Sequence, residues 1–140
     1  EHIFNNMVLL FFLGAKIEKV TGHVTFLVLY FLSGIGGNLC SLLVKLLQMD
    51  YSASVGASGA IFGLDGVLLA WILLDRQSMP DVTPKRVILM IALSLYSGFT
   101  AQNMDNAAHV GGLVTGFLAG LLFCALRKHR RQKKAEEVWT

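Results

Sequence analysis

The sequence predicts an all-α membrane protein, built as one bundle of apolar helices. Of the 140 residues, 54% are hydrophobic and 15% are charged, whereas about 25% of the residues of a soluble domain are charged. The apolar residues form five runs separated by short polar breaks, without the alternation that half-buried strands show. Since lipid cannot satisfy exposed backbone groups, only helices and closed barrels cross a membrane, and runs of this kind indicate helices.

We expect the five helices at residues 3–13, 23–45, 56–74, 87–100 and 107–126. The first run is shorter than the roughly 20 residues that a span needs. The chain begins at Glu1 with an apolar run and without a visible signal peptide. We therefore expect that residues are missing before Glu1, and that residues 1–126 form one N-terminally truncated transmembrane domain.

Lysine and arginine residues set the predicted orientation. The breaks after the first and third runs, together with the tail at residues 127–140, hold eleven of the twelve basic residues, and the other side has only Lys45. Basic loops stay in the cytoplasm, so the tail is predicted to be cytoplasmic. A basic tail can also bind nucleic acid, but directly after an apolar span a cytoplasmic flank is the better interpretation. The first, third and fifth runs then all begin at the outer face.

Ser58 opens the third run and is a candidate nucleophile. It follows Gly56 by two residues and precedes Gly59 directly, and serine is a common small residue where membrane helices pack. However, the start of a helix presents free backbone N–H groups, which can stabilise an oxyanion beside the serine. The glycines would also let a peptide approach closely. This stretch alone leaves both interpretations open.

His109 opens the fifth run and is a candidate general base. Taken alone, it is equally well explained as a buried histidine bonded to a neighbouring helix. Glycines line one face of each of the two runs, namely Gly59, Gly63 and Gly66 in the third and Gly112, Gly116 and Gly120 in the fifth. Glycine-lined helices can pack with their backbones in contact, which would bring the His109 ring to the Ser58 hydroxyl.

His2 and Asn6 open the first run and lie four residues apart, so they share one helix face. They are either a hydrophilic entry to the helix or a pair of donors for an oxyanion. Asn5 competes for this role but points about 100° away from Asn6.

Two carboxylates lie near these residues, and we assign neither to catalysis. Asp65 follows Ser58 by seven residues, about 10 Å along the helix axis, and is expected to face a water-filled interior or to pair with a polar neighbour. Asp105 precedes His109 by four residues; it could orient the ring, but capping the helix is the simpler role.

In this order and spacing, the elements resemble the rhomboid family of intramembrane serine proteases. Gly56-Ala57-Ser58-Gly59 resembles the GxSG nucleophile motif, and Ala108-His109-Val110-Gly111-Gly112 resembles the helix of the catalytic histidine. His2 and Asn6 fit the HxxxN oxyanion element. The resemblance covers nearly the whole chain, from His2 to about Leu126.

The resemblance implies a rhomboid-like bundle with five of the usual six transmembrane helices, the first being missing. It implies that Ser58 attacks the scissile carbonyl and that His109 acts as general base and then as acid. His2, Asn6 and the Ser58 backbone N–H would hold the oxyanion. The expected substrates are single-span membrane proteins, cut in or near the lipid bilayer. No metal, cofactor or nucleic acid is implied.

Two residues depart from the family pattern. Phe62 stands where many members carry tyrosine, and it can still pack on the His109 ring. Asp65 stands where an apolar residue is usual. Gly56, Gly59, Phe62 and Gly112 are thus the expected supporting residues. The short loops favour a bacterial plasma membrane as the location.

Two other classes of protein compete with the protease. A non-catalytic rhomboid-like protein that binds membrane helices would usually lack the serine or the histidine, and both are present. A small transporter or pore would explain polar groups in the membrane, but not the GxSG motif. A soluble α/β-hydrolase is excluded, because its elbow reads GxSxG on a strand-to-helix turn and here residue 60 is alanine.

Overall fold

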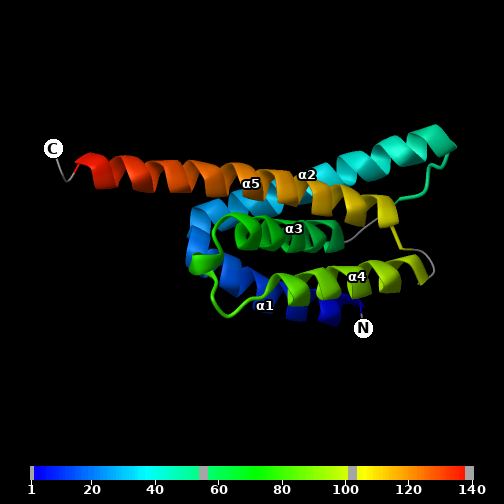
Figure 1. Ribbon diagram of the computed structural model, residues 1–140. Coiled ribbons are helices and arrows are strands. Elements are labelled where there is room, and N and C mark those ends of the chain that lie inside the picture. Colours follow the sequence, from blue (N-terminus) through cyan, green and yellow to red (C-terminus); the bar gives the residue numbers. More distant parts are fainter. Residues whose placement is uncertain (1, 54–56, 101–103, 138–140) are drawn as a thin grey trace.

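The computed structural model describes residues 2–53, 57–100 and 104–137, with only the backbone of residues 2, 3, 5 and 97–99. This part of the chain folds into helices without a strand (Figure 1). The helices are α1 (His2–Thr21), α2 (His23–Gln48), α3 (Ser58–Leu74), the short 3-10 helix η1 (Arg76–Ser78), α4 (Pro84–Thr100) and α5 (Asn106–Glu137). Each of the five apolar runs is a helix, which confirms the all-α prediction.

Four helices extend beyond the apolar runs that predicted them. α2 continues for three residues after Lys45, to Gln48. α1 continues through Gly14 and Lys16 to Thr21, since one glycine inside a helix costs only about 1 kcal/mol. α4 begins at Pro84, a residue that fits the first turn of a helix because no backbone N–H is needed there. α5 continues through the basic tail to Glu137, whose Arg, Lys, Gln, Ala and Glu residues are good helix formers. Residue 126 therefore marks a change of composition and not the end of a helix.

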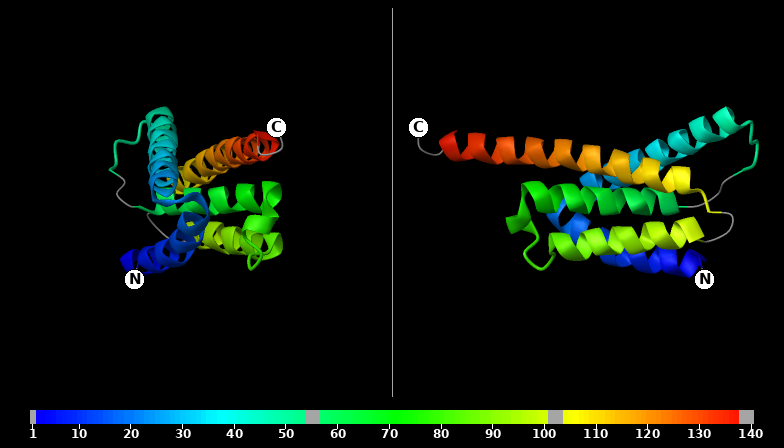
Figure 2. Two further views of the ribbon diagram at one scale, coloured as in Figure 1. Left: turned by 90° about the vertical axis from the view of Figure 1, so that its left-hand side faces the viewer. Right: turned by 45° about the vertical axis from the view of Figure 1, so that its right-hand side comes forward.

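α3 is the central helix of the bundle, with α2 and α5 on one side of it and α1 and α4 on the other (Figures 1 and 2). Residues 59–68 are buried without interruption, and so are Ala70, Trp71 and Ile72. Its most extensive contact is with α5, followed by α2. A helix enclosed on all sides is apolar around its whole circumference, and this explains why Asp65 is the one charged residue inside α3.

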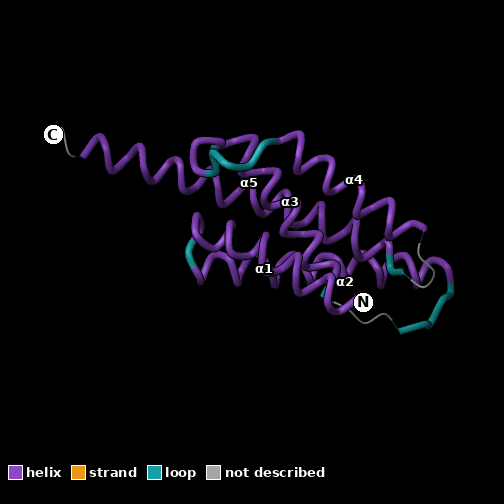
Figure 3. Tube along the Cα trace, turned by 90° about the horizontal axis from the view of Figure 1, so that it is seen from below, coloured by secondary structure: helices purple, strands orange, loops and turns teal. Residues whose placement is uncertain are grey.

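The starts of α1, α3 and α5 lie at the same end of the bundle, as the alternating runs predicted (Figures 1 and 2). The last turns of α2 and α4 reach this end too. At the opposite end, the C-terminal part of α5 projects beyond the other helices (Figure 3). Ser58 and His109 therefore lie at one end of the bundle, and the basic segment of α5 lies at the other.

The outer surface of the bundle suits a lipid environment. Within the described residues, α2 and α5 have the length and hydropathy of a membrane span, and α3 is a shorter apolar helix. α2 presents a row of exposed apolar side chains along its length, namely Val24, Leu27, Phe31, Ile35, Leu39 and Leu42. A large exposed apolar surface on a long helix is what lipid contact requires. The chain is an integral membrane protein with a helical fold.

Candidate active site

The two glycine-lined helices pack with their backbones in direct contact. A methyl group on Gly112 would run into the carbonyl oxygen of Gly59, and one on Gly116 would run into that of Gly63. Farther along, a methyl on Gly120 would lie 2.9 Å from the Cα atom of Val67. Small residues allow such an approach in lipid, where dispersion contacts replace the hydrophobic effect. The predicted packing of α3 against α5 is therefore present.

α2 joins the same contact from another side. A methyl group on Gly37 would lie 2.7 Å from the carbonyl oxygen of Ala108, and a methyl on Gly63 would run into the side chain of Ser33. The Ser33 hydroxyl donates a hydrogen bond to the Leu29 carbonyl at 2.7 Å within its own helix. Because α2 touches both α3 and α5, the three helices fix one another's positions at the end that carries Ser58.

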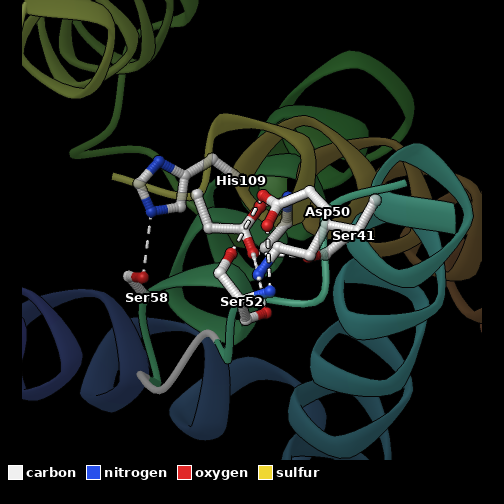
Figure 4. A network of polar contacts seen from close by, with 8 residues as sticks. Ser41, Asp50, Ser52, Ser58 and His109 are labelled. Atoms are coloured by element: carbon white, nitrogen blue, oxygen red, sulfur yellow. Dashed lines mark hydrogen bonds and ion pairs between the residues drawn. The ribbon is translucent and has the colours of Figure 1, made fainter. Parts of the chain in front are cut away.

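This packing brings together two side chains that are 51 residues apart. The Nε2 atom of His109 lies 2.9 Å from the Oγ atom of Ser58 (Figure 4). Ser58 is the first residue of α3, and His109 lies in the first turn of α5. His109 is only 2% exposed, whereas Ser58 is partly exposed. The arrangement allows a proton to pass between the hydroxyl and the imidazole.

Phe62 holds the ring of His109 in place. The two ring centroids are 4.3 Å apart, and the planes differ by 16°, so the rings are stacked. Phe62 lies one turn after Ser58 on α3, and it is almost fully buried. The ring packing predicted for Phe62 is confirmed, although the phenyl ring offers no hydroxyl to the site.

Asp105 caps α5 just before His109. Its Oδ1 atom accepts a hydrogen bond from the Ala108 backbone N–H at 2.9 Å, the usual role of aspartate at a helix N-terminus. The Ser41 hydroxyl donates to the other carboxylate oxygen, and the Lys45 ammonium lies 3.8 Å from that oxygen. The capping interpretation is confirmed, and the cap also ties α5 to α2.

The loop that leads to Ser58 is held by the same lysine. Lys45 Nζ donates to the Ser52 carbonyl at 2.9 Å, and Asp50 accepts hydrogen bonds from the Ser52 backbone N–H and hydroxyl, both at 2.9 Å (Figure 4). These two hydrogen bonds lower the pKa of the Asp50 carboxyl. The sequence reasoning missed Ser41 and Lys45; their spacing of four residues on one helix face was the available signal.

Part of the expected site lies outside the described residues. This applies to Gly56 and to the side chain of His2. Asn6 lies in α1 and is partly exposed, and α1 begins at the same end of the bundle as α3. The oxyanion roles of His2 and Asn6 therefore stay a prediction.

Asp65 is buried at the centre of the bundle. It is only 2% exposed. Its Oδ1 atom shows no hydrogen-bond partner among the described residues, and the expectation of a water-filled surrounding stays a prediction. The physical reason for the burial is the central position of α3, whose circumference is covered by apolar side chains of the other helices.

The fold and the site define a class: a helical membrane protein with a serine and a buried histidine in contact at the starts of two helices. The family model of the Rhomboid domain matches residues 1–126. The chain belongs to the rhomboid family.

Several named proteins are similar to the chain. RHOMBOID-like protein 4 of Arabidopsis thaliana is 38% identical over 130 residues, which cover 91% of the chain and 32% of that protein. RHOMBOID-like protein 1 of the same plant is 38% identical over 127 residues, covering 87% of the chain and 31% of that protein. Rhomboid protease GluP of Bacillus subtilis is 36% identical over 118 residues, covering 84% of the chain and 22% of that protein. The chain thus spans less than a third of the length of each of these relatives. No solved structure matches it.

Proposed function

We propose that this chain carries the catalytic site of a serine endopeptidase that cleaves transmembrane segments of single-span membrane proteins. The observation that supports it best is the 2.9 Å contact between Ser58 Oγ and His109 Nε2. The two groups come from different helices, and they meet at one end of an apolar bundle. A nucleophile and a base within hydrogen-bond reach are the minimum for acyl transfer by a serine.

The proposed reaction proceeds through an acyl-enzyme. As Ser58 Oγ attacks the scissile carbonyl carbon, its proton passes to His109 Nε2. The resulting tetrahedral oxyanion is held by the Ser58 backbone N–H, with His2 and Asn6 as the expected side-chain donors. His109 then gives its proton to the leaving nitrogen, and the C–N bond breaks. Water, deprotonated by His109, attacks the ester carbonyl, and the carboxyl product leaves as Ser58 regains its proton.

The residues around Ser58 and His109 hold the two side chains in position. Stacking on Phe62 limits the tilt of the imidazole, and the glycine contacts fix the distance between the helices. Partial exposure of Ser58 leaves room for a substrate. We further propose that this end faces outward from the cell and that the basic end of α5 is cytoplasmic, because basic residues gather near the latter end. A bacterial plasma membrane stays our prediction for the location.

The test is cleavage of a membrane-embedded reporter by the full-length protein. We expect Ser58→Ala and His109→Ala each to abolish cleavage, and Ser58→Ala to abolish labelling by a serine-directed fluorophosphonate. Matched controls are Ser94→Ala on α4 and His23→Ala at the start of α2, which should cleave like the unaltered protein. Unchanged cleavage by Ser58→Ala would refute the proposal. Binding of the reporter helix without cleavage or labelling by the unaltered protein would favour a non-catalytic helix-binding role.

A further inference from the structure

A basic cavity lies at the end of the bundle opposite to Ser58. Its volume is about 390 Å³, and three parts of the chain line it. The junction of α1 and α2 contributes Thr21, the last residue of α1, and Thr25 in the first turn of α2, and the last turns of α3 contribute Trp71. The rest of the lining comes from α5, namely Phe123, Leu126, Arg127, Arg130, Arg131 and Lys134.

The charges around this cavity are unbalanced. Four of its lining residues are cationic, and none is acidic. Asp75 lies beside the cavity, 3.8 Å from one guanidinium nitrogen of Arg131, and it also accepts a hydrogen bond from the Ser78 hydroxyl at 2.5 Å. Arg127 and Arg131 also line a neighbouring cavity, of about 490 Å³, together with Lys16 and Lys19. Asp81 lines this second cavity as well, so two carboxylates stand against six cations, which leaves a positive potential in this region.

Two buried donors at this cavity lack an acceptor. The Nη1 atom of Arg127 and the Nε1 atom of Trp71 are buried and have no hydrogen-bond partner within the described part of the chain. Trp71 as a whole is only 1% exposed. A buried donor without an acceptor is costly, and native structures rarely keep one. The planar guanidinium of Arg127 matches the oxygen spacing of a phosphate group.

We propose that this cavity binds the phosphate group of an anionic lipid headgroup. A phosphate supplies both the negative charge and the acceptor oxygens that the lining residues lack. The apolar residues that line the cavity favour a lipid over free phosphate. Trp71, Phe123 and Leu126 form an apolar side, and the exposed Val24 and Val28 of α2 continue the apolar surface beyond Thr25. An acyl chain can lie along that surface.

The position of the cavity fits a headgroup. It lies where the apolar part of α5 gives way to its basic part, which is the depth of lipid phosphates. Basic pockets between transmembrane helices at this depth bind anionic headgroups, and long basic side chains extend from helix ends to the interface. The inference does not depend on the proposed protease activity, since none of the lining residues contacts Ser58 or His109.

The test measures binding of a fluorescent phosphatidylglycerol to the purified full-length protein in a zwitterionic detergent, with the phosphatidylcholine analogue in parallel. The test variant is Arg127→Gln combined with Arg130→Gln. Its matched control is Lys128→Gln combined with Lys133→Gln, which removes the same charge from the same helix but from residues that do not line the cavity.

We expect the unaltered protein to prefer phosphatidylglycerol. Each cation near the headgroup contributes about fivefold in affinity, so the test variant should bind about 25-fold more weakly and the control within about twofold. Arg127→Lys keeps the charge but loses the planar fork, and should weaken binding severalfold. Equal losses in both double variants would overturn the proposal, because they would mean general attraction to a basic helix. Equal binding of both lipids would also overturn it.

Competition separates the two sources of phosphate. Inorganic phosphate is added at up to a thousandfold excess over the lipid. Under the proposal it displaces little lipid, because it lacks the acyl chains that contact the apolar side of the cavity. Displacement at concentrations similar to those of the lipid would overturn the assignment to a lipid.

Discussion

Gly112→Ala is expected to disable the site without touching a reacting group. Gly112 lies three residues after His109 on α5, and its α-carbon faces the backbone of α3. The added methyl group would run into the Gly59 carbonyl oxygen, which is main chain and cannot rotate away. α3 and α5 must therefore separate at the point where Ser58 and His109 meet.

The size of this separation follows from ordinary contact distances. A carbon atom and a carbonyl oxygen rest about 3.3–3.6 Å apart, whereas the added methyl would lie 1.9 Å from the Gly59 oxygen. The helices must therefore move apart by about 1.4–1.7 Å. The distance from Ser58 Oγ to His109 Nε2, which is 2.9 Å, would then exceed about 4 Å, beyond a hydrogen bond. A misplacement of about 1 Å can cost about 100-fold in rate, equivalent to about 2.7 kcal/mol in the activation free energy.

The assay compares kcat for cleavage of a membrane-embedded reporter and the rate of fluorophosphonate labelling at Ser58. A graded variant and a control accompany it. Gly59→Ala places a methyl 3.1 Å from the Ala108 carbonyl oxygen, so a shift of a few tenths of an ångström suffices and we expect the rate to fall tenfold or less. In Gly14→Ala the added methyl meets side chains and no backbone, with the end of the Phe26 ring nearest at 3.2 Å, so this variant should cleave normally.

Thermal unfolding in detergent shows whether Gly112→Ala still folds. Overpacking costs about 1–3 kcal/mol, while replacing glycine inside a helix returns up to about 1 kcal/mol, so a folded protein is expected. The reasoning is refuted if folded Gly112→Ala keeps the full kcat. It is equally refuted if Gly59→Ala lowers the cleavage rate more than Gly112→Ala, because the variant with the milder steric clash would then have the larger effect on catalysis.

Substitutions at three further positions test other parts of the bundle. Asp105→Ala removes the acceptor of the Ala108 N–H and should lower the free energy of unfolding by about 1 kcal/mol; Asp105→Asn, measured in parallel, should have a smaller effect. Phe62→Leu removes the stacked ring, whose interaction with the imidazole is worth about 0.5–1.5 kcal/mol, and should reduce kcat severalfold. Phe62→Tyr keeps an aromatic ring at this position and should leave kcat unchanged. Equal kcat values for the two variants would contradict a role of the ring. Asp65→Leu removes a buried carboxyl with an unpartnered oxygen and should raise the unfolding temperature by a few degrees; a lower temperature would show that this carboxyl stabilises the fold.

The sequence predicted the helices well because lipid and burial impose the same requirement on every span. An apolar run must be helical and must end near charge, and this rule places all five helices. It fails at helix ends, because a helix does not stop where its apolar part stops. α1 crosses Gly14 and Lys16, and α5 continues through the basic tail, since neither glycine nor charge breaks a helix that already has good formers around it.

The site was predictable where it rests on a repeated pattern and not where it rests on single contacts. The glycine spacing on two helices predicts the approach of Ser58 and His109. The bond from Ser41 to Asp105 joins residues 64 positions apart, and one serine and one aspartate form no pattern. The same is true of Trp71 and Arg127, whose unpartnered nitrogens become visible only when α3 and α5 are placed side by side.

The glycine contacts also determine which faces of α5 tolerate amino-acid substitutions. Along one face, backbone meets backbone, so the distance between α3 and α5 is set by main-chain atoms and no choice of rotamer can restore it after a substitution. Along the other face, Val114, Leu118 and Leu122 are exposed, and lipid accepts any apolar side chain there. The position of His109 relative to Ser58 should therefore be insensitive to changes on the outer face and highly sensitive to a single methyl group on the inner one.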